Sequence, residues 1–252
     1  MNPYESEKLV AEYLLLHYGK PGEVCPWPFV PEGALDFPKR LVSEFPEFRE
    51  QDSSGHALEV GCATGRTCLE LSRNFSSVEG IDFSQAFIDA AKAVQSAEIS
   101  NFNAPGEGDS SASFEITRDQ TWKPDRVNFQ AGDACSLPEF DKHFEVLVGA
   151  NLICRLPEPD KFLARLPELV VPEGLLLVTS PYTWLDEFTP RKHWLGGYEE
   201  NGRQVRTLDT LQKQLEDDFT LLRTKDMPFM IREHSRKFQW SVTEASLWRR
   251  KA

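Results

Sequence analysis

The sequence has no long apolar run and no excess of positive charge, and both absences narrow the range of functions. No apolar run approaches the ~18 residues that span a bilayer, so we expect no transmembrane segment. The formal net charge is −12 over 252 residues. Because affinity for nucleic acid rests largely on cations that contact phosphates, this acidic chain favours a small-molecule partner and predicts no binding to nucleic acid or to a membrane.

Closely spaced cysteine pairs are also absent, and we expect no leader sequence. The cysteines form no CxxC pair and no Cys/His cluster with zinc spacing, which predicts no metal site. The N-terminal stretch MNPYESEK has neither the basic nor the apolar region of a secretory signal peptide. We therefore expect a cytoplasmic protein with reduced thiols at Cys25, Cys62, Cys68, Cys135 and Cys154.

Residues 1–50 are expected to form a helical lid over the rest of the chain. Asn2 is the predicted N-cap of a first helix, with Glu5 completing a capping box and Gly19 ending the helix. The proline-rich stretch PGEVCPWPFVP cannot be regular structure. A second short helix is expected over residues 36–44.

Strands and helices alternate through residues 51–252. This alternation predicts an α/β, Rossmann-like fold with a seven-stranded, mostly parallel sheet, covered on both faces and ending in an antiparallel strand. The expected strands are 56–61, 78–81, 127–131, 144–149, 174–182, 219–227 and 237–249, and the expected helices are 66–73, 84–96, 160–169 and 208–216. Residues 99–126 read as an insertion, with residues 103–113 as a mobile surface loop rather than a segment that covers a site.

The turn after the first expected strand has an unusual glycine spacing. Glu59 is followed by Gly61, Ala63 and Gly65 at alternate positions. This order does not fit the G-x-G-x-x-G fingerprint of dinucleotide-binding proteins, so a dehydrogenase is the least favoured function. It does fit E/D-x-G-x-G-x-G with alanine in the middle position. In this respect the chain resembles class I S-adenosylmethionine-dependent methyltransferases.

The loop residues suit the amino-acid end of that donor. Gly61 lets the backbone approach the ligand, and Gly65 opens the following helix closely. Glu59 can face the ligand's ammonium group, and Ala63 occupies the remaining position of the cofactor-binding loop.

Later strand ends supply the other half of the predicted cofactor site. Asp82 follows a strand about 20 residues beyond the loop, where a carboxylate can accept hydrogen bonds from both ribose hydroxyls. In AGDAC, Asp133 can accept a hydrogen bond from the adenine amino group while Ala134 packs on the ring. Phe83 is suited to the other face of the adenine.

A closer resemblance extends over nearly the whole chain. It is similar to the methyltransferase family of ovothiol biosynthesis, which methylates the imidazole π-nitrogen of 4-mercaptohistidine. In many members this unit is the C-terminal domain of an iron-containing sulfoxide synthase, so the resemblance implies pairing with a separate synthase. The similar segments are NPYESEKLVAEYLLLHYG, LEVGCATGRTCLELS, GIDFS, GDAC, PYTWLDEFTPRKHWLGGY and REHSRKFQWSVTEASLWRR.

The acceptor site is expected after the fourth and fifth strands of the sheet and in the N-terminal segment, to which Tyr4 belongs. Asn151 and Tyr182 are the predicted catalytic residues that orient the ring, and Trp184, also assigned as catalytic, flanks it together with Trp194. Several candidates remain for each charged contact. The substrate carboxylate needs Arg155, Arg191, Lys192 or Arg232; its ammonium needs Glu5, Glu187 or Glu233; and His193 or His234 could take a proton.

Two other functions stay open. The chain could methylate another small acid or amine, or it could bind the nucleoside without transferring a methyl group. Turnover of the labelled donor separates these alternatives from the ovothiol assignment.

Overall fold

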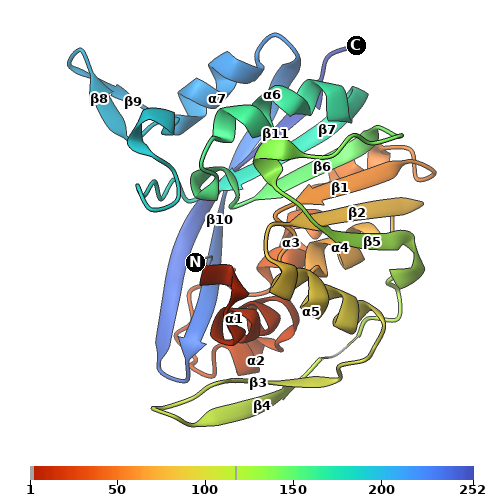
Figure 1. Cartoon of the computed structure of the whole chain (residues 1–252), viewed down its shortest axis with the longest axis vertical. Coiled ribbons are helices and arrows are strands. Elements are labelled where there is room, and N and C mark those ends of the chain that lie inside the picture. The colour runs from red at the N-terminus through yellow and green to blue at the C-terminus, as the bar shows by residue number, and fades with distance from the viewer. Residues whose placement is uncertain (1–2, 117) are drawn as a thin grey trace.

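A computed structural model describes residues 3–116 and 118–252. Its main sheet has seven strands in the order β10-β11-β7-β6-β1-β2-β5 (Figure 1). Strand β11 runs antiparallel to both of its neighbours, whereas the other neighbouring pairs are parallel. The predicted fold class is therefore confirmed. The strands are β1 (His56–Val60), β2 (Ser77–Asp82), β5 (Val127–Ala131), β6 (Phe144–Ala150), β7 (Val170–Ser180), β10 (Phe219–His234) and β11 (Lys237–Arg250).

Helices cover both faces of this sheet because its central strands are apolar on both sides. In β6, Val146 and Val148 join one hydrophobic core, while Leu147 joins the other. The first core lies against α1 (Glu7–Tyr18), α3 (Phe37–Ser43), α4 (Arg66–Leu71) and α5 (Gln85–Gln95), and the second against α6 (Pro159–Leu169) and α7 (Thr207–Leu215). Shorter elements are α2 (Pro21–Val24), β8 (Tyr198–Glu200), β9 (Arg203–Val205) and the 3-10 turns η1 (Pro3–Glu5), η2 (Pro46–Glu50), η3 (Pro124–Arg126), η4 (Ala134–Ser136), η5 (Ile153–Arg155) and η6 (Arg191–His193).

The first helix begins later than its sequence suggested. Residues Pro3–Glu5 form the 3-10 turn η1, and α1 starts after Ser6, whose hydroxyl accepts a hydrogen bond from the Leu9 backbone N–H at 3.3 Å. A serine side chain is a strong N-cap and stops the helix from extending backwards. The predicted start was wrong for this reason; Asn2 itself lies outside the described residues.

The insertion is also more ordered than predicted. The expectation of a surface loop over residues 103–113 was wrong, because β3 (Asn101–Pro105) and β4 (Ser111–Glu115) form an antiparallel hairpin. Phe102 and Phe114 lie opposite each other, with ring centroids 5.8 Å apart. Phe114 and Ala104 pack with residues of α1. This packing gives the hairpin an apolar contact that its Gly- and Ser-rich composition does not reveal.

The last two strands extend beyond the rest of the sheet. Strand β10 continues to His234 rather than ending near residue 227, because the N-terminal segments pack against its distal half. The Phe37 and Phe229 rings, for example, are 5.1 Å apart. The N-terminal helices are therefore held between this long hairpin and α5, as Figure 1 shows.

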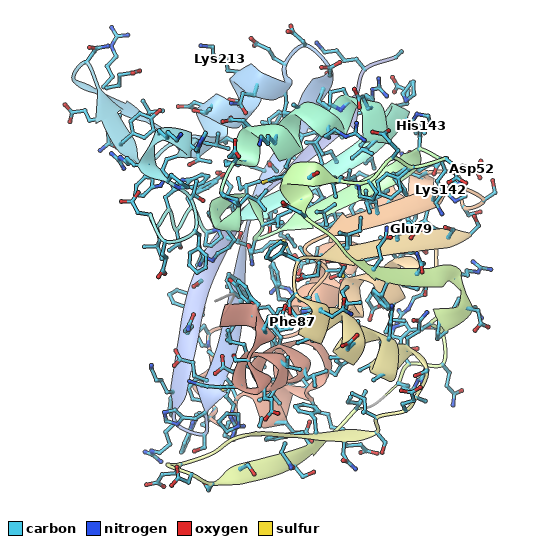
Figure 2. All side chains as sticks on the ribbon, in the orientation of Figure 1. Asp52, Glu79, Phe87, Lys142, His143 and Lys213 are labelled. Atoms are coloured by element: carbon cyan, nitrogen blue, oxygen red, sulfur yellow. The ribbon has the colours of Figure 1, made fainter. Side chains whose placement is uncertain are left out.

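An ion pair lies on the sheet away from these helices. Lys142 Nζ is 2.7 Å from Glu79 Oε1 and joins β2 to the segment before β6. Figure 2 shows these two side chains close together, well separated from Phe87 on α5. Within the described ranges, none of the helices has the length and apolar character needed to cross a bilayer.

Candidate functional site

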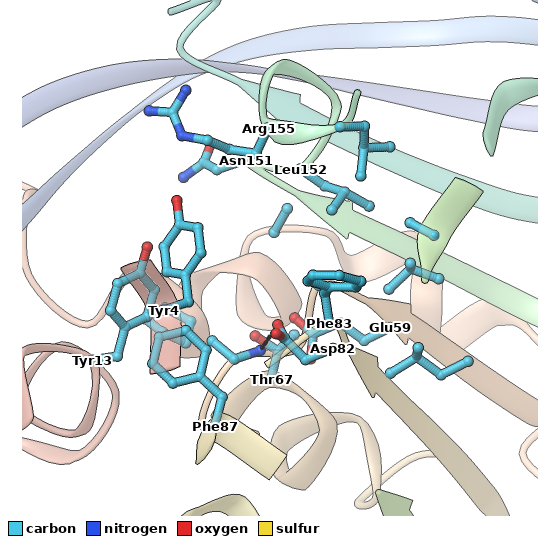
Figure 3. Close-up of a pocket in the computed structure, with 18 of the residues that line it drawn as sticks. Tyr4, Tyr13, Glu59, Thr67, Asp82, Phe83, Phe87, Asn151, Leu152 and Arg155 are labelled. Atoms are coloured by element: carbon cyan, nitrogen blue, oxygen red, sulfur yellow. Dashed lines mark hydrogen bonds between the residues drawn. The ribbon is translucent and has the colours of Figure 1, made fainter. Parts of the chain in front are cut away.

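A cavity of about 480 Å³ opens at the carboxyl ends of the parallel strands. It lies where the strand order reverses between β1 and β6, the point at which open α/β sheets bind ligands. The N-terminal segments line the cavity through Tyr4, Tyr13 and Phe37. Figure 3 shows Tyr4 and Tyr13 on the side of the cavity away from Glu59. Two parts of the lining differ in chemistry. We call the end of β1, the loop after it and the ends of β2 and β5 the donor half, and the lining residues that follow β6 and β7, together with those of the N-terminal segment, the acceptor half.

The donor half begins with the loop between β1 and α4. Gly61, Ala63 and Gly65 all have positive φ, at 81°, 46° and 87°. Gly61 and Ala63 line the cavity. Gly65 lies behind the loop, where an added Cβ would be 2.5 Å from Cζ of Phe129. The alternation of glycine and alanine therefore creates a left-handed backbone that brings the main chain to the cavity wall.

Asp82 ends β2 beside this loop. Its carboxylate accepts hydrogen bonds from the backbone N–H groups of Ala63 and Ser84, each at 2.9 Å. Each oxygen keeps a further lone pair, and the residue lines the cavity, so the carboxylate can accept from two vicinal hydroxyls. Burial raises the pKa of Asp82, while the backbone donors oppose that rise.

Glu59 lies at the base of the cavity, where its carboxyl group is buried. The Cys68 thiol donates a hydrogen bond to Oε2 at 3.0 Å. Burial raises the pKa of Glu59 to about 8, from an ordinary value of 4.5. A buried carboxyl group lining a cavity gains most from a cationic ligand, because a nearby positive charge favours its ionised form. This property fits the ammonium group of an amino acid.

Three further donor-half residues line the cavity at the end of β5 and near its mouth. The Asp133 carboxylate accepts a hydrogen bond from the Cys135 N–H at 2.8 Å. Ala134 is buried, whereas the Phe83 ring is 67% exposed and free to cover a flat ligand. Their individual contacts with an adenine remain predictions, but the carboxylate and the two apolar surfaces suit an adenine that lies between them.

In the acceptor half, Asn151, Arg155, Glu187 and Tyr4 of the predicted residues line the cavity. The Asn151 Oδ1 atom accepts hydrogen bonds from the hydroxyls of Thr179 and Thr243. Arg155 donates to the Thr183 carbonyl at 2.9 Å. Burial raises the pKa of the Tyr4 hydroxyl, and the neighbouring Arg155 opposes that rise.

Other predicted acceptor residues lie elsewhere. The Tyr182 hydroxyl donates to Glu244 Oε2 at 2.6 Å, and both line a separate hollow of about 200 Å³. Trp184 is buried, donates from Nε1 to the Thr207 hydroxyl at 3.0 Å and stacks against Trp194. The segment between β7 and β8, residues 181–197, which we call the aromatic loop, thus places these three rings in packing contacts on the α7 side of the sheet.

The remaining charged candidates lie outside the cavity, and most of them contact other residues there. The Arg191 guanidinium lies 4.2 Å from the Trp194 ring centroid. Arg232 is buried and donates to the Glu23 carbonyl. Elsewhere, Glu233 pairs with Lys237, Glu5 accepts from the N–H groups of Gln85 and Ala86, His193 lies 3.8 Å from Asp160, and His234 accepts from the Arg236 N–H. Lys192 belongs to the turn η6.

Several lining residues were missed in the sequence, notably Tyr13, His17 and Phe87. The rings of Tyr13 and Phe87 are 4.8 Å apart. His17 Nδ1 accepts a hydrogen bond from the Arg66 N–H at 3.2 Å, and burial followed by the Arg66 charge lowers its pKa to about 3. Tyr13 and His17 are four residues apart on one helix face, a signal equally typical of ordinary core packing.

Metal chemistry has no side-chain cluster to support it in this part of the chain. Residues 3–116 and 118–252 contain no group of three or more His, Cys, Asp or Glu side chains arranged to hold a metal ion.

Comparison with known proteins agrees with this geometry. The ubiquinone biosynthesis O-methyltransferase of Coxiella burnetii is 24% identical over 125 residues, which cover 50% of this chain and 43% of the relative. The chain thus spans less than half the length of that curated relative.

Solved structures share the fold at low sequence identity. The N-methyltransferase NodS from Bradyrhizobium japonicum has a TM-score of 0.53 and 14% identity, with coverage of 86% of this chain and 96% of that one. Magnesium protoporphyrin IX methyltransferase from Synechocystis, with bound SAH, has a TM-score of 0.52 and 14% identity, with coverage of 84% and 82%.

A family model described as a methyltransferase domain matches residues 32–221. The matched range contains the whole donor half, including Glu59, Asp82 and Asp133. The chain belongs to the methyltransferase domain family, whose cofactor is S-adenosylmethionine.

Proposed function

We propose that this chain is an S-adenosylmethionine-dependent N-methyltransferase that methylates the imidazole π-nitrogen of 4-mercaptohistidine. One observation carries the proposal: a single cavity joins the carboxylates of the donor half to a compact acceptor half with aromatic walls and Asn151, Arg155 and Glu187. The similarity of the chain to the ovothiol methyltransferases supplies the identity of the acceptor. The cavity is suited to a flat ring that carries amino-acid groups.

The donor half would hold the cofactor through opposite charges and hydrogen bonds. Glu59 would face its ammonium group, Asp82 its ribose hydroxyls and Asp133 its adenine. When bound, the cofactor supplies a methyl group on a positively charged sulfur, and transfer forms a nitrogen–carbon bond as the carbon–sulfur bond breaks and leaves its electron pair on sulfur.

The acceptor half would hold the amino-acid end of the substrate at its rim. The Arg155 guanidinium would pair with the substrate carboxylate, and Glu187, which is exposed at the rim, would face its ammonium group. Arg155 also lies 4.7 Å from the Phe188 ring centroid, which restricts its orientation. Tyr4, Tyr13 and Phe87 form an aromatic wall suited to a flat imidazole.

The reaction needs little acid–base chemistry from the protein. A ring that bears a thiolate and keeps its other nitrogen protonated becomes a neutral zwitterion when its π-nitrogen is methylated. The lining histidine, His17, is held neutral and its Nδ1 is already engaged by Arg66. The main contribution of the chain is therefore to position the ring and exclude water.

A direct comparison of acceptors tests the proposal. Purified protein with labelled S-adenosylmethionine should give a much higher kcat/KM with 4-mercaptohistidine than with histidine or its N-methyl derivatives, because histidine leaves the polar groups that face the sulfur unpaired. Equal values for the two acceptors would remove the ovothiol assignment. Donor binding without turnover of any imidazole would favour a nucleoside-binding module, and turnover of another small acid or amine would favour the broader methyltransferase alternative.

The chemistry of the acceptor also implies a preceding reaction. A separate sulfoxide synthase would have to form the ring carbon–sulfur bond, and the resulting sulfoxide would then have to be cleaved and reduced to the thiol before this chain acts. Supplying the thiol made by these steps to the purified chain should give the same methylated compound as synthetic 4-mercaptohistidine, as measured by mass spectrometry.

A further inference from the structure

The amide of Asn151 is held by an unusual arrangement of buried hydroxyls. Asn151 follows β6 with φ at 52°, a left-handed conformation that asparagine tolerates better than most residues. Its backbone N–H donates to the Thr179 carbonyl at 2.9 Å and lies 3.1 Å from the Thr179 hydroxyl. The residue is thereby tied to the end of β7, on the wall of the cavity.

Two threonines determine which end of this amide faces the cavity. The Thr179 hydroxyl donates to Asn151 Oδ1 at 3.1 Å, and the Thr243 hydroxyl donates to the same atom at 2.7 Å. Both threonines are fully buried. If the amide rotated by 180°, its NH₂ group would donate to the two hydroxyl oxygens, and the hydroxyl hydrogens would lose Oδ1 as their acceptor, which is costly in a buried site. The network therefore fixes the amide with Oδ1 toward the sheet.

The opposite end of the amide is available to a ligand. Asn151 and Tyr4 both line the cavity, and Figure 3 shows the Asn151 side-chain nitrogen pointing to the side on which Tyr4 lies. An amide NH₂ group donates hydrogen bonds but cannot give up its proton at ordinary pH. It can thus stabilise an anionic acceptor atom without neutralising it.

We propose that Thr179 and Thr243 are positioning residues that aim the Asn151 Nδ2 atom at the anionic sulfur of the acceptor ring. This inference rests on the proposed function. A hydrogen bond to the sulfur stabilises the thiolate form, in which the other ring nitrogen keeps its proton and the π-nitrogen keeps its lone pair. Plain histidine offers no sulfur, so the fixed donor would stay unpaired when histidine binds.

Substitutions on β11 test the positioning role. Thr243→Val keeps the shape of the side chain and removes the hydroxyl, and should lower kcat/KM for 4-mercaptohistidine by roughly tenfold, the scale of one lost hydrogen bond. Thr243→Ser restores the hydroxyl and should remain within about threefold of the wild type. Affinity for S-adenosylhomocysteine, measured by calorimetry, should be the same in both variants.

Ser246 provides the matched control. It is also a buried hydroxyl residue of β11, but it donates to the Val178 carbonyl and belongs to the other face of the strand. Ser246→Ala should reduce thermal stability without changing kcat/KM. An equal loss of kcat/KM in Ser246→Ala and Thr243→Val would indicate a general structural effect and overturn the positioning role.

A spectroscopic measurement separates this inference from the proposed function. The side-chain NH₂ resonances of Asn151, assigned by their loss in Asn151→Asp, should shift when 4-mercaptohistidine is added with S-adenosylhomocysteine, but not when histidine is added. They should be sharp in the wild type and broadened by exchange in Thr243→Val. If the wild type does not turn over 4-mercaptohistidine, the proposed function fails, and the linewidths alone decide whether the threonines fix the amide. Unchanged linewidths in Thr243→Val overturn the positioning role, whether or not the wild type turns over 4-mercaptohistidine.

Discussion

The donor half and the acceptor half of the cavity are built in different ways. In the donor half, Glu59 and Asp82 lie in the last residues of β1 and β2, and Asp133 follows β5. The ends of these neighbouring strands are joined directly through backbone groups, since the N–H groups of Ala63 and Gly132 donate to the carboxylate and the carbonyl of Asp82. In the acceptor half, the hydroxyl that holds Asn151 comes from Thr243, 92 residues away. One half depends on local backbone geometry, and the other on packing between distant segments.

The two halves also differ in the groups that face the ligand. The donor half presents three carboxyl groups and a backbone loop, which are suited to a cation and to hydroxyl or amino hydrogens. The acceptor half presents a guanidinium, an amide and aromatic rings.

The largest expected effect concerns the donor half alone. Asp82→Ala removes a carboxylate that is predicted to accept from two ribose hydroxyls, and hydrogen bonds to charged groups contribute about 1.5–3 kcal/mol each. We expect the Kd for S-adenosylhomocysteine to rise by about 100-fold in calorimetry. Asp52→Ala, at an exposed acid with the same charge, should leave it unchanged. Equal donor affinity in Asp82→Ala and the wild type would contradict the ribose role.

The next prediction separates the acceptor half from the donor half. Arg155→Met should raise the KM for 4-mercaptohistidine by about tenfold or more, because the substrate carboxylate loses a charge-assisted partner. The Kd for S-adenosylhomocysteine should not change. Arg191→Met is the matched control, since Arg191 lies against Trp194 outside the cavity. If Arg191→Met had the larger effect on KM, the substrate carboxylate would lie in the aromatic loop instead.

The difference between the halves explains what could be predicted from the sequence. The alternation of strands and helices was sufficient for the fold class, and the acids at the ends of successive strands were sufficient to find the lining carboxylates Glu59, Asp82 and Asp133. Each of these positions follows directly from the end of a parallel strand. A strand end fixes where the next residue lies, so a local pattern is enough.

The acceptor half could be predicted only in part, for a physical reason. The loop after β7 contains Tyr182, Trp184, Arg191 and Glu187, and composition alone does not say which of them turn inward. Trp184 packs against α7 and donates to the Thr207 hydroxyl, and Tyr182 donates to Glu244 of β11, so neither side chain turns into the cavity. The β3–β4 hairpin was missed similarly, because its stability comes from packing with α1.

Glu59 allows the donor half to be tested by pH. Its pKa is raised to about 8 in the folded chain from an ordinary 4.5, so the unfolded chain loses this proton first as the pH rises. The stability contributed by the protonated group is present below pH 4.5 and is lost as the pH rises through about 8. His17 acts oppositely: its pKa of about 3 makes stability rise with pH, but only up to its ordinary value of 6.5.

The two effects separate above the ordinary pKa of histidine. Between about pH 6.5 and 8 the wild type should lose thermal stability, and Glu59→Gln should lose less. Binding of S-adenosylhomocysteine near pH 6.5 should also release close to one proton in the wild type and none at this site in Glu59→Gln, as measured by calorimetry in buffers of different ionisation enthalpy. No proton release by the wild type would mean that Glu59 does not face the ammonium group.

The smallest expected effect lies in the loop that defines the donor half. Ala63 has φ at 46°, where an L-residue with a side chain costs about 1–2 kcal/mol. Ala63→Gly removes this strain, while the greater freedom of glycine in the unfolded chain costs about 0.5–1 kcal/mol. The net gain should be about 0.5 kcal/mol, or about 1–2 °C in Tm for a chain of this size.

A second alanine in the same strand-and-loop unit provides the contrast. Ala57 is fully buried in β1. Ala57→Gly should destabilise the fold by about 1–2 kcal/mol, because a strand residue gains backbone freedom and the core loses a methyl group. Opposite signs for the two substitutions in thermal unfolding would show that the donor loop carries local strain that its strand does not. A loss of stability in Ala63→Gly would mean instead that the Ala63 methyl contributes more through packing than its backbone conformation costs.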